Sequence, residues 1–307
     1  MTEGRTALLI NARARLGRGA ETVAVAALRH LGIHLDRMVR VRHPRHLDRA
    51  VQSLLNPEHC VTRLIVGGGD GTLSTVAPWL AGTGILLGVL PLGTANDFAR
   101  TLGIPSNPLA AAAVAAGDHA VDVDMARAND AYFLNVASIG LSVAMTGELS
   151  PRMKRWLGPA AYAVAGGRAL VRHPTFRARF EHDSQGDAAG EMVHQVVVAN
   201  GRFYGGGVLV DSLSTLDDGS LTAYTLGRRS RWQLLRTVAL LRFKVPLDRP
   251  GDSFIRVANL RVETWPPQPV NLDGEIRTRT PVDFAVVPGA LRVLAPEEAD
   301  QPGRTSS

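Results

Sequence analysis

The first 125 residues alternate short apolar runs with segments whose apolar residues recur at helical spacing, and this alternation constrains the fold most strongly. The expected strands cover 6–11, 35–41, 64–67, 85–90 and 121–125. The expected helices cover 20–31, 44–55, 72–80 and 108–116. Strands that alternate with helices pair in parallel, and the helices cover both faces of the sheet. The amino half therefore predicts a doubly wound α/β domain over 1–125.

The pattern changes beyond residue 125, where strand candidates become longer and glycine or polar turns replace the helices. These candidates cover 131–137, 175–182, 191–200, 220–226, 254–264 and 282–287. Consecutive strands of this kind predict an antiparallel β-sandwich, here over 126–287, with one inserted helix at 156–171. The polar tail 297–307 is expected to be disordered.

Composition narrows the class of protein only in part. A chain of 307 residues with 45% hydrophobic residues can form two domains with real cores. A single cysteine, Cys60, excludes an internal disulfide, and we see neither a secretory leader nor an apolar stretch of membrane-spanning length. We expect a soluble, cytoplasmic protein. The net charge of +6 would suit a nucleotide, an anionic membrane or nucleic acid, so charge alone does not choose a partner.

A glycine-rich turn, Gly68 to Thr72, follows the expected strand 64–67. Glycines allow backbone N–H groups to close around phosphate oxygens, and Asp70 is short enough to reach a magnesium ion there. A tight turn without a ligand explains these five residues almost equally well.

A second polar turn, within 91–100, follows the next expected strand and favours the phosphate site. Asn96 or Asp97 would cap the helix that comes after it. Parallel sheets bind ligands at the carboxyl ends of their strands, where the two turns would gather. Neither turn matches a Walker A loop or the G-x-G-x-x-G dinucleotide pattern, so the phosphate site is of another type.

Taken together, the motifs resemble those of the diacylglycerol kinase catalytic-domain superfamily, which includes sphingosine and ceramide kinases and soluble bacterial lipid kinases. The order and spacing of the segments make the resemblance specific, whereas the glycine turn alone also occurs in NAD kinases and phosphofructokinases. The matching segments are Asn11, 68–72, 91–100, 124–129, 135–141, 200–207, 218–219, 273–275 and 288–293. The resemblance implies an α/β nucleotide domain followed by a β-rich lipid domain, with segment 288–296 returning to the first.

The resemblance also implies a nucleotide site in the first domain. Asp70 would organise the catalytic magnesium, through water, because magnesium sheds its hydration reluctantly. The residues implied to contact ATP are Asn11, Arg15, Gly68, Gly69, Gly71, Thr72, Thr94 and Asn96.

Two further carboxylates receive catalytic roles by resemblance. Glu275 would take the proton from the lipid hydroxyl, and a glutamate is basic enough only where desolvation or a nearby acid raises its pKa toward neutral. An exposed glutamate beside a β-turn is the other interpretation. Asp124 would support the magnesium network, and Asp122, two residues earlier on the same strand face, is its alternative.

A separate structural magnesium is implied in the sandwich. Its ligands would be the side chain of Asp218 and the backbone carbonyls of Thr215 and Ser220, since oxygen ligands suit a hard cation. Asp217 competes with Asp218 for the side-chain role, and an ordinary surface turn is the other interpretation.

The chain departs from the family pattern at several polar positions. Residues Ala12 to Arg15 replace the usual proline and serine-glycine pair, Ser74 and Thr75 replace asparagine and glutamate, and Ser142 replaces an aspartate. These changes touch polar partners of the site, so acceptor choice, magnesium affinity or competence can differ from those of relatives.

The function that we expect is an ATP- and Mg²⁺-dependent lipid kinase that phosphorylates a hydroxyl of diacylglycerol or a similar lipid. An NAD-kinase-like phosphotransferase and a non-catalytic nucleotide or lipid sensor are the alternatives. The expected partners are ATP, a lipid alcohol and the inner membrane surface, and not nucleic acid. Arginines interleaved with leucines in 228–244 are a candidate for peripheral membrane contact. The basic residues do not gather on one face of a helix, so an ordinary packed helix is the other interpretation. The identity of the lipid, the nucleotide preference and homodimer formation stay open.

Overall fold

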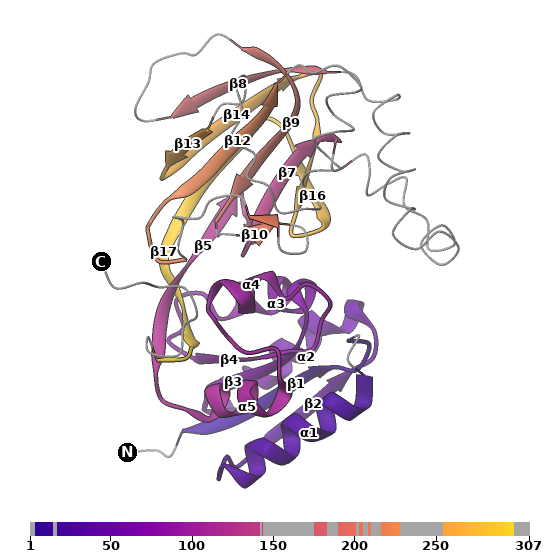
Figure 1. The fold of residues 1–307 in the computed structure, drawn as a ribbon, viewed down its shortest axis with the longest axis vertical. Coiled ribbons are helices and arrows are strands. Elements are labelled where there is room, and N and C mark those ends of the chain that lie inside the picture. Colours follow the sequence, from indigo (N-terminus) through magenta and orange to yellow (C-terminus); the bar gives the residue numbers. More distant parts are fainter. Residues whose placement is uncertain are drawn as a thin grey trace. The chain divides into compact units, whose positions relative to one another are not determined.

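A computed structural model describes residues 4–14, 17–141, 143, 175–182, 190–200, 203–204, 208–209, 216–227 and 254–297. The chain divides into two compact units, one formed by Met1–Met125 with Val287–Ser307 and the other by Ala126–Val286 (Figure 1). Two strands, β5 (Ala120–Ala128) and β17 (Val282–Leu294), carry the chain from one unit into the other.

The first unit is built on a parallel sheet in the order β2-β1-β3-β4, and the end of β17 pairs with β4. Its strands are β1 (Arg5–Asn11), β2 (Arg37–Val41), β3 (Val61–Gly68) and β4 (Leu86–Pro91). Residues 7–10 and 64–66 are fully buried. Continuous apolar runs are expected in a parallel sheet that is covered on both faces.

Helices cover both faces of this sheet, with α1 and α5 on one side and α2, α3 and α4 on the other (Figure 1). The helices are α1 (Gly17–His30), α2 (Leu47–Leu54), α3 (Asp70–Val76), α4 (Asp97–Thr101) and α5 (Pro108–Ala116). Asn107 begins α5 by accepting the N–H groups of Leu109 and Ala110. The predicted doubly wound domain is confirmed. The predicted helix 72–80 ends earlier, at Val76, and a 3₁₀ turn with Pro78 follows, since proline cannot donate the next helical hydrogen bond.

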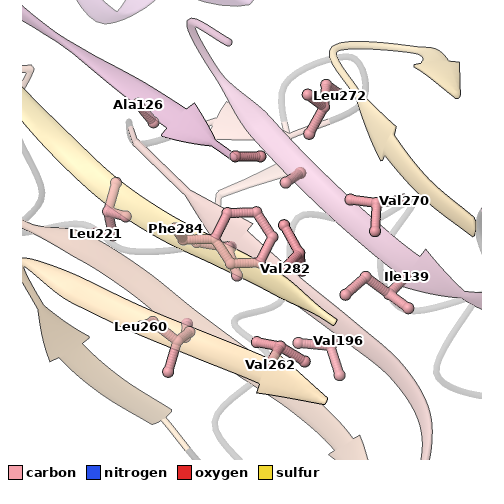
Figure 2. Close-up of a cluster of buried hydrophobic side chains, with 14 of the residues drawn as sticks. Ala126, Ile139, Val196, Leu221, Leu260, Val262, Val270, Leu272, Val282 and Phe284 are labelled. Atoms are coloured by element: carbon pink, nitrogen blue, oxygen red, sulfur yellow. The ribbon is translucent and has the colours of Figure 1, made fainter. Parts of the chain in front are cut away.

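The described residues of the second unit form antiparallel strands around a large apolar core, with a smaller buried cluster of Val136, Val197 and Ala199. Its strands are β6 (Ala131–Phe133), β7 (Val136–Gly140), β8 (Phe176–His182), β9 (Glu191–Ala199), β10 (Phe203–Tyr204), β11 (Val208–Leu209), β12 (Leu221–Gly227), β13 (Phe254–Val257), β14 (Asn259–Trp265), β15 (Pro269–Leu272) and β16 (Glu275–Arg279). Figure 2 shows Val196, Leu260, Val270 and Phe284 converging in the core from four strands. The Phe133 and Phe284 rings meet edge to face at 6.2 Å.

Two predicted strands are divided in the structure. The run 131–137 forms β6 and β7, and the run 254–264 forms β13 and β14. The second division has a clear cause, because β13 pairs with β12 whereas β14 pairs with β8 and β17. The predicted helix 156–171, the stretch 228–244 and the tail from 298 onward lie outside the described residues. Within the described part of the chain, no helix is both long and apolar enough to span a bilayer.

Candidate active site

Three parallel strands of the first unit end at the same edge of the sheet, and the predicted nucleotide residues follow those ends. Asn11 is the last residue of β1, and its Nδ2 donates to Thr72 Oγ1 at 2.9 Å. The amide of Leu92, just after β4, donates to the Gly68 carbonyl at the end of β3 at 2.9 Å. The structure therefore brings Asn11, the glycine turn and the turn after β4 together.

The glycines of these turns differ in whether packing requires them. A Cβ on Gly69 would lie 2.9 Å from the Gly93 Cα, and a Cβ on Gly68 would lie 2.6 Å from the Thr72 side chain. Gly69 therefore allows the two turns to pack closely, and Gly68 leaves room for the Thr72 side chain. Gly71 is exposed in the first turn of α3, and a Cβ there would meet no atom within 4 Å. Packing does not explain Gly71, because the space beside its backbone is open.

Asp70 links the two turns through its carboxylate. Its Oδ1 accepts the N–H of Phe98, in the first turn of α4, at 3.1 Å, and the residue is half-buried. Among the described residues, its Oδ2 makes no hydrogen bond. A carboxylate that is fixed by one oxygen and free at the other suits an interaction with a metal-bound water.

Asn96 shapes the second turn with its side chain. Its Oδ1 accepts the Gly93 N–H at 3.0 Å, and its Nδ2 donates to the Pro91 and Gly93 carbonyls, both at 3.3 Å. Its φ of 51° lies in the left-handed region, which asparagine tolerates better than most residues. The amide is thus engaged within the turn, whereas Thr94 at the tip is exposed.

Asp97 is a buried carboxylate that the sequence suggested only as a helix cap. It is 5% exposed and accepts from Arg100 Nη1 at 3.5 Å. It directly precedes Phe98, the partner of Asp70. Aspartate is almost never fully buried unless it is paired, so the burial of Asp97 indicates that this carboxylate has a role in the turn. Its position after Asn96, at the start of a predicted helix, was the only sequence signal for such a role.

Asp124 and Asp122 differ sharply in environment. Asp124 is 5% exposed, and its Oδ1 accepts the Gly289 N–H at 2.8 Å, which ties β5 to β17 within the first unit. The Asp122 side chain is 72% exposed and pairs with Arg292 at 3.6 Å. Burial and the backbone bond single out Asp124, while its part in a magnesium network stays a prediction.

Part of the predicted structural magnesium site is described. Asp218 Oδ1 accepts both the amide and the hydroxyl of Ser220, at 2.9 and 2.7 Å. Thr215, like Arg15 of the predicted nucleotide site, lies outside the described residues. Among the residues that the structure describes, no three His, Cys, Asp or Glu side chains form a metal cluster. The predicted sites draw on carbonyls and water as well, so they stay predictions.

Glu275 belongs to the second unit and begins β16. The Asp273-Gly274 turn that precedes it has positive φ at both residues, 48° and 100°, as a two-residue type I′ hairpin turn requires. The Glu275 side chain is 64% exposed and pairs with Arg277 at 2.6 Å. The second unit alone therefore does not desolvate this carboxylate.

The second unit also has an open hollow of about 670 Å³ that contains none of the predicted site residues. It is lined by Arg127, Asn129, Asp130, Glu181, His182, Asn259, Leu260, Arg261, Asp283, Phe284 and Ala285. Hydrogen bonds from Arg261 to Asp283 and then to Glu263 raise the pKa of the guanidinium. Arg261 forms one salt bridge to Glu263 on its own strand, β14, and one to Asp283 on β17.

Comparison with known proteins identifies the class of both units. Residues 5–128 match the diacylglycerol kinase catalytic domain, and residues 135–295 match the YegS C-terminal NAD kinase beta sandwich-like domain. A probable lipid kinase YegS-like protein of Pseudomonas aeruginosa strain PAO1 is 37% identical over 280 residues, which cover 89% of this chain and 88% of the relative. A diacylglycerol kinase of Staphylococcus carnosus is 28% identical over 253 residues, or 82% of each chain.

A solved structure supports the same assignment. A "putative diacylglycerol kinase" from Bacillus anthracis str. Sterne matches with a TM-score of 0.79 and 26% identity, covering 96% of each chain. The two units are therefore those of a two-domain lipid kinase fold. The chain belongs to the diacylglycerol kinase catalytic-domain family, in the group with a YegS-type sandwich, as the sequence resemblance predicted.

Proposed function

We propose that this chain is an ATP- and Mg²⁺-dependent kinase that transfers the γ-phosphoryl group to a hydroxyl of diacylglycerol or a similar lipid. Membership of the family supports the kinase class, and the names of the relatives support a lipid acceptor. The observation that carries the proposal is the arrangement of residues at the carboxyl-terminal edge of the first sheet. There an exposed glycine with open space beside it, Gly71, follows a carboxylate held by the neighbouring turn, Asp70.

Each part of phosphoryl transfer has a candidate residue in the first unit. The ATP phosphates would lie beside Gly71 and the exposed Thr94, with Asn11 at the end of β1. Magnesium, when bound, neutralises the charge that develops on the phosphate oxygens. Asp70 would hold its hydration shell through Oδ2, because Oδ1 is already bonded to Phe98.

The acceptor half of the reaction belongs to the second unit. Glu275 would take the proton from the lipid hydroxyl, which requires its carboxylate to leave Arg277 and water. Both partners of this pair are more than half exposed, so the pair costs little to open. We infer that substrate binding supplies the desolvation. A lipid acceptor also implies contact with a membrane surface, for which 228–244 stays the candidate segment.

A second candidate, an NAD-kinase-like phosphotransferase, has one specific point in its favour. The family description that matches the second unit itself refers to the NAD kinase sandwich. The two activities differ in their products, since a phosphorylated lipid enters an organic phase and a phosphorylated dinucleotide stays in water.

The proposal is tested with γ-labelled ATP, magnesium and a panel of lipids and NAD, followed by organic extraction. We expect label in the organic phase with diacylglycerol or a related lipid, and none with Asp70→Asn. The matched control Asp283→Asn changes an exposed acid on the sandwich and should keep activity. Label found only in the aqueous phase with NAD, or no transfer to any acceptor, would contradict the proposal.

A further inference from the structure

The turn that precedes Glu275 is fastened to the neighbouring segment by one carboxylate. Asp273 Oδ2 accepts the N–H of Leu134 at 2.7 Å, and Oδ1 accepts those of Asn135 and Val136, both at 3.0 Å. Three consecutive backbone donors thus converge on one side chain. Such a group of N–H donors forms a concave site for an anion, and here the anion is part of the chain itself.

Further hydrogen bonds hold both partners of this contact. The Asp273 N–H donates to the Val136 carbonyl at 2.9 Å, and the Gly274 N–H donates to Asn271 Oδ1 at 2.8 Å. From the other side, Asn200 donates its Nδ2 to the Leu134 carbonyl at 3.0 Å. Because Asn200 is 1% exposed, the segment that receives Asp273 is itself anchored in the interior.

The hairpin turn does not by itself require a carboxylate. Asn-Gly forms a type I′ turn at least as well as Asp-Gly, since both residues need only tolerate a positive φ. The three donors do require one, because an asparagine at 273 would turn an NH₂ group toward one or two of the N–H groups. The negative charge at this position is therefore explained by the contact with 134–136 and not by the turn.

We propose that Asp273 is a positioning residue for the reaction, and that it fixes the hairpin tip from which Glu275 acts. This inference rests on the proposed function, because it needs Glu275 as the base. In the described sheet order β16 is the terminal strand and pairs with β15, so little else restrains its first residue. The Glu275 side chain is mostly exposed, so packing does not hold it either.

The test is a double-mutant cycle with Asp273→Asn and Glu275→Ala. Misplacing a catalytic group by about 1 Å costs on the order of 100-fold, so Asp273→Asn should lower kcat by about 100-fold. Its KM for ATP should stay unchanged, because the nucleotide residues belong to the other unit. If Asp273 acts only through Glu275, the double variant should be no slower than Glu275→Ala alone. A purely structural role would add a further loss, and so would overturn the proposal.

Hydrogen exchange provides a readout that does not depend on activity. In Asp273→Asn the amides of residues 134–136 should exchange faster than in the wild type, while Asp283→Asn, the same change at an exposed sandwich acid, should leave them unchanged. Unchanged exchange in Asp273→Asn, or wild-type kcat, would refute the inference. If the wild type phosphorylates no lipid, the proposed function fails, and exchange alone then decides whether Asp273 holds residues 134–136.

If Asp273→Asn does not fold, a milder variant can replace it in the test. Asn271→Ala removes the acceptor for the Gly274 amide and leaves the three bonds to 134–136 in place. It should lower kcat by about 10-fold with KM for ATP unchanged, and it should add no loss to Glu275→Ala. Wild-type kcat in this variant would contradict a tip whose position matters.

Discussion

Replacing Gly71 with alanine should stabilise the protein and weaken its binding of ATP. The added Cβ meets no atom within 4 Å, so the substitution introduces no strain. Alanine is favoured over glycine within helices, and near a helix start the gain is about 0.5 kcal/mol. For a protein of this size that corresponds to a rise in Tm of about 1 °C.

The same substitution should weaken the binding of ATP. If a phosphate lies against this backbone, the new methyl group moves it away from a charge-assisted hydrogen bond worth about 1.5–3 kcal/mol. Since about 1.4 kcal/mol is tenfold in affinity, the KM for ATP should rise about 10- to 100-fold. Thermal unfolding gives the first quantity, and transfer rates measured across ATP concentrations give the second.

Gly117→Ala is the matched control. Its φ is −70°, and its Cβ would make only ordinary contacts, so it should gain similar stability. The Gly117 carbonyl accepts from Arg63 near the amino end of β3, whereas the nucleotide turns follow the carboxyl ends of the strands. Its KM for ATP should therefore not change. An unchanged KM in Gly71→Ala, or a lowered Tm, would refute the reasoning.

The remaining predictions concern the packing and the acids of the first unit. Gly93→Ala should lower stability by about 1–3 kcal/mol, because its Cβ would collide with the Gly69 backbone; an unchanged Tm would argue against the close approach of the turns. Asp124→Asn should cost about 1–3 kcal/mol in denaturant unfolding and Asp122→Asn less than about 1 kcal/mol, since only Asp124 is buried; equal losses would contradict this difference. Asp70→Ala should stop transfer and also cost about 1 kcal/mol, because the carboxylate bonds the first turn of α4; full stability would show that this bond contributes nothing.

Local sequence signals predicted the elements of the fold but not where strands change partner. The alanine-rich run 108–116 predicted α5 with its observed bounds, because helix propensity is local. The predicted strand 282–287 ended too early, because β17 continues through Pro288 and Gly289 to Leu294. Gly289 takes a φ of 58° there, and its amide bonds Asp124. That contact joins residues 165 positions apart, which periodicity cannot detect.

The candidate site shows the same limit. The glycine-rich turn 68–72 and the polar turn within 91–100 were predicted to lie at one edge, because parallel strands end together. The structure joins these two turns through hydrogen bonds of Asp70 and Leu92. Sequence could not tell that Gly69 is required by packing whereas Gly71 is not, since that depends on which backbone passes nearby. The contact of Asp273 with three amides was also hidden, because an Asp-Gly pair already accounts for a turn.

One measurement tests most directly whether the first unit binds ATP and the second supplies the catalytic base. It compares ATP binding and lipid phosphorylation in the wild type and in Glu275→Gln. The account predicts that the variant binds an unreactive ATP analogue with wild-type affinity while its kcat on the lipid falls by about 10²- to 10⁴-fold, the usual cost of losing a general base. Wild-type turnover by Glu275→Gln would contradict the account, and so would a loss of nucleotide affinity equal to its loss of rate.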